Sequence, residues 1–563
     1  MNFYKLVNKY KNSLISICCI AIVLLGANTA FFKDVVYESD DYFLHATRTA
    51  NYYLAIKQGQ FPVRWGPNLN QSYGYPAFNY MYHTPYFAGA VLHSFGLSVQ
   101  QSLNTVVLLT LILGGISAYV FIRSYLQSES WSILLSVFFI SNPYTLLNVY
   151  WRGAIGELLF YAVVPLFLLA VKKKHIVGIA VTTAFLILSH LPSMILLAGL
   201  SFIYVFVEFK NNYTNKTIVS IFGGGLLGIL LSSWYWIPAI FEQWMIRYEL
   251  GASLNQYVTQ FISLPGLFDI RKHFSSSALF TNVLSLGSVN ILALLLIPYL
   301  SKKSKTVIFW FILIASSLFL LTPLSAGIWD LAKLLQYVQY PWRFLWVINI
   351  ASIMIFITLA AQKEISLLTK KMFFVLILFG VIFSAQKFII TKKSITRSNF
   401  DWYHPATSTG SSFNEHDPIW SNIPYYLPEE LSYVLATQSA AITDKNKTNL
   451  VQKLSDLNPQ IIRFDGRVIT YTVTPHQEVI VLYKRLFYPG WEAYLDKKKV
   501  DFVTDIPEYT GILAVKLPAE TESHVSVVFT GYTQTRKFSE ILSSITLFGI
   551  ILYYLLKKLW QNS

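Results

Sequence analysis

The chain has 563 residues, of which 54% are hydrophobic and only 13% are charged, whereas soluble domains usually carry about 25% charged residues. This composition excludes an ordinary soluble protein. The formal net charge of +15 does not indicate nucleic-acid binding, because residues 392–536 hold 15 Lys and Arg against 16 Asp and Glu, and the excess lies in the apolar remainder, as expected for basic cytoplasmic loops.

Apolar runs long enough to cross about 30 Å of hydrocarbon predict twelve transmembrane helices. They lie near residues 13–32, 100–122, 130–150, 154–171, 175–191, 193–209, 217–241, 286–300, 305–323, 343–361, 372–388 and 537–556. Lys5, Lys9 and Lys11 precede the first run as in a signal peptide, but no small-residue cleavage site follows, so we expect a retained helix. The predicted fold class is therefore a polytopic α-helical membrane protein.

Basic residues favour one orientation of these helices. With the N-terminus inside, the cytoplasmic connections and chain ends hold 17 Lys and Arg against three acidic residues, Glu129, Glu208 and Glu364. The positive-inside rule then predicts a multi-pass protein of the cell membrane with both termini in the cytoplasm. Three long connections fall outside: residues 33–99, 242–285 and 391–536.

The sequence divides into three predicted parts. Residues 1–391 form a transmembrane module whose first external loop is residues 33–99, and residues 537–563 form the last helix and a cytoplasmic tail. Residues 392–536 are polar and include alternating stretches such as 468–473, which predict a small external β-rich domain. Cys18 and Cys19 are adjacent within the first span, so no disulfide framework supports this domain.

The first external loop contains the residues with the clearest chemical pattern. After Asp40, a segment of helical period runs to Lys57, and it places Asp41, His45 and Arg48 on one face. A carboxylate near a helix start often caps free N–H groups. Capping is therefore the alternative to a chemical role for the acidic pair.

Further motifs extend this pattern along the chain. The loop continues with Pro-x-Arg-Trp, which contains Arg64, and with Gly-Tyr-Pro, which contains Tyr75. Later segments are Tyr-Trp-Arg-Gly-Ala with Glu157 five residues after its arginine, Ser-His-Leu-Pro at 189–192, Gln-Tyr-Pro-Trp-Arg-Phe at 339–344, and Phe-Tyr-Pro-Gly-Trp at 487–491.

An Asp-x-x-x-His helix followed by Pro-x-Arg-Trp and Gly-Tyr-Pro resembles the first external loop of the GT-C superfamily. These are membrane glycosyltransferases that use polyprenyl-phosphate sugars. Within the superfamily the sequence is most similar to bacterial YfhO-like proteins, some of which are described as 6-pyruvoyl-tetrahydropterin-synthase-related membrane proteins. The resemblance implies a GT-C-like transmembrane module whose catalytic centre lies in the first external loop.

The resemblance also implies roles for individual residues. Asp41 aligns with the catalytic aspartate of the loop, and Asp40 is the second candidate; such a carboxylate would take the proton of an attacking hydroxyl. Arg64, Arg152 and Arg343 are the candidates for holding the lipid phosphate. The alternative for each arginine is a side chain that snorkels to lipid headgroups.

The other candidate substrate-binding residues are His45, Tyr75, Glu157 and His190. Glu157 has an alternative role in pairing with Arg152 or in compensating a helix dipole. His190 has an alternative role in satisfying backbone groups at a helix end.

The sequence leaves cofactor use open. Carboxylate and imidazole groups at Asp40, Asp41 and His45 could converge on a divalent metal ion, and some GT-C enzymes need a metal whereas others do not. No Walker A motif occurs in the sequence, so we do not expect the chain to be an ATPase.

These observations predict a glycosyltransferase that moves a sugar from a polyprenyl-phosphate-linked donor to an acceptor outside the cell. The acceptor would be a cell-envelope glycan, a lipid or a protein. Two alternatives stay open: a flippase or transporter for lipid-linked sugars, and a non-catalytic membrane assembly protein. A transporter usually has polar sites near the bilayer midplane, whereas here the motifs cluster at one predicted face.

Cysteine labelling tests the predicted topology. Single cysteines at Ser412 and Ser455 should react with membrane-impermeant reagents on intact cells, and a cysteine at Ser304 should not, because the basic connections lie inside. Labelling at Ser304 alone would reverse the orientation.

Overall fold

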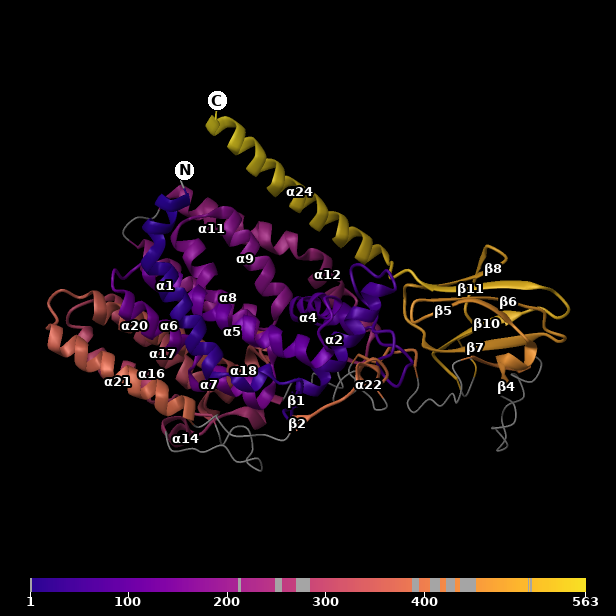
Figure 1. Ribbon diagram of the computed structural model, residues 1–563, viewed down its shortest axis with the longest axis horizontal. Coiled ribbons are helices and arrows are strands. Elements are labelled where there is room, and N and C mark those ends of the chain that lie inside the picture. The colour runs from indigo at the N-terminus through magenta and orange to yellow at the C-terminus, as the bar shows by residue number, and fades with distance from the viewer. Residues whose placement is uncertain are drawn as a thin grey trace.

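The computed structural model describes residues 3–210, 214–248, 256–269, 284–386, 394–405, 416–421, 431–435, 452–504, 506 and 509–562. The labelling position Ser412 and parts of the long external connections lie outside these residues. A helical body and a β-rich part lie side by side, and the last helix leads from the β-rich part back along the body (Figure 1).

Helices or broken helices coincide with all twelve predicted spans. They are α1 (Phe3–Ala27), α5 (Val99–Arg123), α6 (Glu129–Ile140) with α7 (Pro143–Leu147) and a π-helical turn (Asn148–Arg152), α8 (Ile155–Lys172), α9 (Ile176–Ser189), α10 (Ser193–Phe209), α11 (Asn215–Leu231) with α12 (Ser233–Phe241), α16 (Ser288–Leu300), α17 (Thr306–Leu320), α20 (Phe344–Ala361), α21 (Leu367–Gln386) and α24 (Gln534–Asn562). Among the described residues, five helices are long and apolar enough to cross a membrane, or seven if each of two bent pairs is one span. The class is confirmed, and the count of twelve stays a prediction.

Local sequence sets where several of these helices begin. At the start of α5, Ser98 and Gln101 form a capping box in which each side chain accepts from the other's backbone N–H. Ser128 caps α6, and Asn142 caps α7 directly before Pro143. Proline is favoured at a first helical position because it lacks the N–H that would be unpaired there. Helix α5 packs against α8, α6 and α1 in the body.

Short elements build the predicted external connections. In the first loop these are β1 (Val36–Tyr37), α2 (Tyr42–Lys57), α3 (Ala77–Tyr80) and α4 (Thr84–Ser94). Later connections contain α14 (Leu264–Phe268), α18 (Ala326–Leu331), α19 (Lys333–Gln336) and 3₁₀ turns at Gln243–Met245, Gln256–Gln260, Pro323–Ser325 and Pro341–Arg343, and a further 3₁₀ turn at Thr29–Phe32 follows α1.

The segment after α21 returns to the first loop. Its strand β2 (Ser394–Ile395) pairs antiparallel with β1, and α22 (Asn399–Tyr403) packs on α2. The buried ring of Trp402 lies 5.2 Å from that of Phe43, between centroids. Residues 394–403 therefore pack with the transmembrane module, although the sequence placed them in the β-rich domain.

The β-rich part consists of two antiparallel sheets, which confirms the predicted β character. One sheet has the order β10-β7-β3-β4 and the other β5-β6-β11-β8-β9. The strands are β3 (Leu431–Leu435), β4 (Gln452–Lys453), β5 (Gln460–Phe464), β6 (Val468–Val473), β7 (Val479–Leu486), β8 (Trp491–Leu495), β9 (Lys498–Val500), β10 (Ile512–Leu517) and β11 (Ser523–Phe529), with a 3₁₀ turn at Leu454–Leu457. Alternate residues of β6 and β11 are buried, as expected for strands with one covered face.

The first loop and the β-rich part share a hydrophobic core. The buried indole of Trp65 lies 5.3 Å from the ring of Phe529 and 5.6 Å from that of Trp491. A Cβ at Gly74, which has a φ of 78°, would lie 2.3 Å from the Trp65 ring, so glycine permits this close approach. The β-rich part is therefore joined to the loop by packing as well as by the chain.

Candidate functional site

The start of α2 is fixed against the π-helical turn that ends at Arg152. The N–H of Asp40 donates to the carbonyl oxygen of Trp151 (3.0 Å), and the N–H of Asp41 donates to that of Arg152 (2.8 Å). Gly153 has a φ of 68°, and a Cβ there would lie 2.8 Å from the Ser39 hydroxyl oxygen, so this contact requires glycine. Turns of π-helix often mark functional sites.

Asp40 and Asp41 have different surroundings. Asp40 is exposed, whereas Asp41 is half-buried. The Asp41 side chain makes no capping hydrogen bond to α2, because the Ser39 hydroxyl accepts the N–H of Tyr42 instead (3.1 Å). Capping therefore does not account for the Asp41 carboxylate, which interacts electrostatically with the guanidinium groups of Arg48 and Arg152.

His45 follows one turn later on the same face of α2. Its Nδ1 lies 2.8 Å from the Tyr86 hydroxyl, and its Nε2 lies 3.5 Å from the Tyr82 hydroxyl. Burial, together with the positive charges of Arg48 and Arg152, holds the pKa of His45 well below its usual range. The imidazole is therefore neutral at pH 7, with one nitrogen donating and the other accepting.

Glu157 joins two arginines at the ends of different helical segments. It is buried in the first turn of α8, and its Oε2 accepts from Arg152 Nη1 and from Arg343 Nε, both at 3.0 Å. Its Oε1 accepts from the hydroxyl of Tyr144. A buried charge is tolerated when it is paired and hydrogen-bonded. The alternative of pairing with Arg152 is thus part of the observed arrangement, and Arg343 is the second partner.

Arg343 lies in the 3₁₀ turn that Pro341 begins and that leads into α20. Its Nη1 donates to the side-chain oxygen of Gln339 (3.1 Å), and its Nη2 lies 3.4 Å from Nε2 of His190. The Nδ1 of His190 lies 2.7 Å from the Ser193 hydroxyl, so this histidine contacts both a helix end and an arginine. We call Arg152, Glu157, His190 and Arg343 the Glu157 cluster.

Aromatic rings cover the two arginines of the Glu157 cluster. The guanidinium carbon of Arg152 lies 4.3 Å from the ring centroid of Trp342, and that of Arg343 lies 4.9 Å from the centroid of Tyr340. Such contacts are attractive and are stronger when water is excluded. Both arginines are buried in protein, which is not the geometry of a side chain that snorkels to lipid headgroups.

Arg64 and Tyr75 lie away from the Glu157 cluster. Arg64 donates to the side chains of Asn79 (2.9 Å) and Glu540 (2.8 Å), and the Tyr75 hydroxyl accepts the N–H of His416 (3.0 Å). The structure therefore pairs Arg343 with Arg152 and not with Arg64. The 16 residues of α2 separate Asp41 from the turn before Arg64, a length of about 24 Å.

The described residues contain no group of three or more His, Cys, Asp or Glu side chains that could hold a metal ion. The hypothesis of a divalent cation held by Asp40, Asp41 and His45 therefore gains no support from the geometry. Asp40 is exposed, and the imidazole of His45 contacts tyrosine hydroxyl groups, so these side chains do not converge on one point.

Several residues of the site were not proposed as site residues from the sequence. They are Tyr82, Tyr86 and Tyr144, together with Arg48 and Trp342, which the sequence analysis noted only within larger patterns. Arg48 had a signal, because its spacing places it on the Asp41 face of α2. The tyrosines had none, since the chain contains 36 and such residues are common at membrane interfaces.

Replacing Glu157 by glutamine tests the electrostatic role of the cluster. We expect Glu157→Gln to lower the free energy of unfolding by about 3–5 kcal/mol, because two buried guanidinium groups lose their shared counterion. Thermal unfolding of the purified protein in detergent is the measurement. The matched control is Glu364→Gln, since Glu364 forms an exposed pair with Lys303 (2.7 Å) and exposed pairs contribute about 0–1 kcal/mol. Equal melting temperatures for the two variants would contradict the assignment.

Comparison with solved structures finds two of the mycobacterial arabinofuranosyltransferase AftD, one of them a mutant. Their TM-scores to this chain are 0.41 and 0.39, both at 14% sequence identity. The matches cover 68% of this chain but only 28% and 27% of the AftD chains, so this chain spans little more than a quarter of the length of AftD. No curated protein sequence matches.

A family model matches residues 78–394 and is described as the 6-pyruvoyl-tetrahydropterin synthase related domain of a membrane protein. The match covers more than half of the chain, including all four residues of the Glu157 cluster. The chain therefore belongs to the family of 6-pyruvoyl-tetrahydropterin-synthase-related membrane proteins.

Proposed function

We propose that the protein is a glycosyltransferase that moves a sugar from a polyprenyl-phosphate-linked donor to an extracellular glycan, lipid or protein. The observation that carries this proposal is the half-buried Asp41 carboxylate, which is not used for capping and interacts electrostatically with the guanidinium groups of Arg48 and Arg152. The backbone N–H of Asp41 donates to the carbonyl oxygen of Arg152 (2.8 Å). One position thus offers a proton acceptor next to guanidinium groups suited to a phosphate.

Asp41 acts as the general base in this proposal. A sugar hydroxyl is a weak nucleophile, so a carboxylate must take its proton as the oxygen attacks the anomeric carbon. The bond between the anomeric carbon and the phosphate oxygen breaks, and its electron pair leaves with the phosphate. Attack from the face opposite the phosphate inverts the configuration of the anomeric carbon.

Arg152 and Arg343 stabilise the leaving phosphate in this proposal. Negative charge grows on the phosphate oxygens in the transition state, and preorganised guanidinium groups lower its free energy. Glu157 holds both arginines in place through Nη1 of Arg152 and Nε of Arg343. In this proposal the neutral His45, which contacts two tyrosine hydroxyl groups, contributes to sugar binding without adding charge.

The position of the site agrees with a lipid-linked donor. Arg152 ends one predicted span, Glu157 lies in the first turn of the next, and Arg343 directly precedes α20. All three are therefore near the depth where the phosphate of a membrane lipid lies. This clustering at span ends favours transfer over the transporter alternative, in which polar sites usually lie near the bilayer midplane.

The Asp41→Asn variant tests the proposed base. The amide keeps the shape of the side chain but cannot accept the proton, so we expect transfer to fall by about 10²–10⁴-fold with unchanged membrane insertion. The measurement is mass spectrometry of envelope polymers and glycolipids from cells that lack the protein and are complemented with each variant. The neighbouring exposed Asp40→Asn is the matched control and should restore the product. If Asp41→Asn restores the product fully, Asp41 is not the general base, and a non-catalytic assembly protein becomes the better account.

The Arg343→Lys variant tests the proposed phosphate contact. Lysine keeps the charge but not the paired N–H geometry, and loss of one charge-assisted hydrogen bond costs about 1.5–3 kcal/mol. We therefore expect the donor concentration for half-maximal transfer to rise at least about tenfold. The control is Arg463→Lys, because Arg463 pairs with Asp465 on an exposed strand. An unchanged donor dependence in Arg343→Lys would remove Arg343 from the phosphate site.

A further inference from the structure

A pocket lies at the opposite end of α2 from Asp41. It is lined by the turn 59–62, by residues 529–532 at the end of β11, and by Arg64, Arg467 and Glu540. Three parts of the chain thus meet there: the first loop, the β-rich part and the start of α24. The length of α2, about 24 Å, separates this pocket from the proposed catalytic site.

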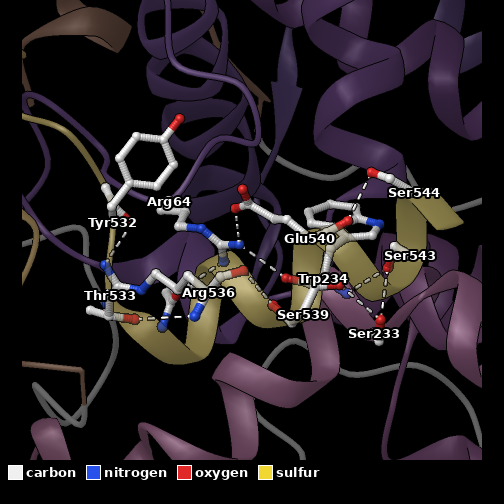
Figure 2. A network of polar contacts seen from close by, with 12 residues as sticks. Arg64, Ser233, Trp234, Tyr532, Thr533, Arg536, Ser539, Glu540, Ser543 and Ser544 are labelled. Carbon is white, nitrogen blue, oxygen red and sulfur yellow. Dashed lines mark hydrogen bonds and ion pairs between the residues drawn. The ribbon is translucent and has the colours of Figure 1, made fainter.

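Positive charge exceeds negative charge around this pocket. Arg64 donates to Glu540, and Figure 2 shows the two side chains meeting above the first turns of α24. Behind them Arg536 pairs with the buried Glu242 (2.7 Å). The guanidinium of Arg467 forms no ion pair within the described part of the chain and donates to backbone carbonyl oxygens, including that of Gln58 (3.1 Å), whereas the backbone N–H of Arg467 donates to the carboxylate of Asp465 (2.8 Å). Among the residues that line the pocket, Arg64 and Arg467 therefore face one carboxylate, that of Glu540.

The excess of positive charge changes the pKa of Arg64. Burial and repulsion by Arg536 lower the pKa of the Arg64 guanidinium, although Glu540 opposes this effect. Outside the pocket the ammonium group of Lys537 lies 5.2 Å from the ring centroid of Tyr532 and adds another positive charge. An anion in the pocket would relieve the repulsion between these cations.

Apolar side chains surround the mouth of the pocket. Phe61 and Tyr532 line it and are exposed, with 80% of Phe61 accessible. Helix α24 continues from there with exposed Phe538, Ile541 and Ile545 at spacings of three and four residues, which places them on one helix face. In a membrane protein an uncovered apolar face of this kind faces lipid, so the pocket opens at the level where headgroups lie.

We propose that this pocket binds the phosphate headgroup of an anionic phospholipid in the leaflet around the start of α24. The phosphate lies between Arg467 and Arg64, and the acyl chains run along Phe538 and Ile541. A bound lipid of this kind fastens the β-rich part and the first loop to the last helix. This site is independent of sugar transfer.

Native mass spectrometry of the full-length protein in detergent tests the proposal. The protein is titrated with phosphatidylglycerol, which is anionic, and with phosphatidylcholine, which is zwitterionic. We expect one phosphatidylglycerol to be retained in preference to phosphatidylcholine. In Arg467→Gln its apparent affinity should fall about tenfold, since a charge-assisted contact is lost, and Lys537→Gln, at an exposed position, should weaken it less.

Glu540→Gln separates a binding role from a structural one. Removing this carboxylate takes away the competitor for Arg64, so phosphatidylglycerol retention should rise, whereas damage to the fold would lower it. The matched control is Glu478→Gln, because Glu478 pairs with Lys516 on the β-rich part and this variant removes the same negative charge remote from the pocket.

Four results would overturn the proposal. The first three are equal retention of both lipids by the unmodified protein, unchanged phosphatidylglycerol retention in Arg467→Gln, and lowered retention in Glu540→Gln. Displacement of the lipid by soluble glycerol phosphate at equal concentration would assign the pocket to free phosphate esters and would also reject the lipid.

Discussion

The arrangement at the ends of the helices α8 and α20 depends on one buried carboxylate. Glu157 is shared by Arg152, at the end of a π-helical turn, and by Arg343, at the start of α20. Each guanidinium group would be costly to bury alone, so the three groups fix three chain segments relative to one another. The same turn receives the backbone N–H groups of Asp40 and Asp41. Glu157 therefore indirectly positions the proposed base as well as the phosphate-binding arginines.

Helix α2 links this cluster to a second set of buried charges. At its far end Arg64, Glu540, Arg536 and Glu242 connect the first loop with α12 and α24 (Figure 2). Trp65 follows directly in sequence and fills the core of the β-rich part. The first loop is thus held near its start by the backbone hydrogen bonds of Asp40 and Asp41, and near its middle by the ion pair of Arg64 and the aromatic packing of Trp65. A rigid loop suits a carboxylate that must meet a substrate at a defined distance.

The sequence predicted the helices well and the long-range contacts only in part. Long apolar runs identify helices because lipid requires internal hydrogen bonding, and the i, i+4 spacing placed Asp41 and His45 on one face. The motifs also identified Arg152, Glu157, His190 and Arg343, which the structure brings together. The position of Arg64 was not predictable, because its partner Glu540 lies 476 residues later in the chain and no local pattern joins them. The pairing of β1 with β2 was also missed. The two strands are far apart in the sequence, and each has only two residues, which is too short for an alternating pattern.

A structure of the protein with a bound polyprenyl-phosphate sugar is the most direct test of the central claim that the chemistry occurs beside the Glu157 cluster. The account predicts phosphate density within hydrogen-bonding distance of Arg152 and Arg343, with the anomeric carbon facing Asp41. Phosphate density at a position that neither arginine reaches, with Glu157 still paired to both, would contradict it.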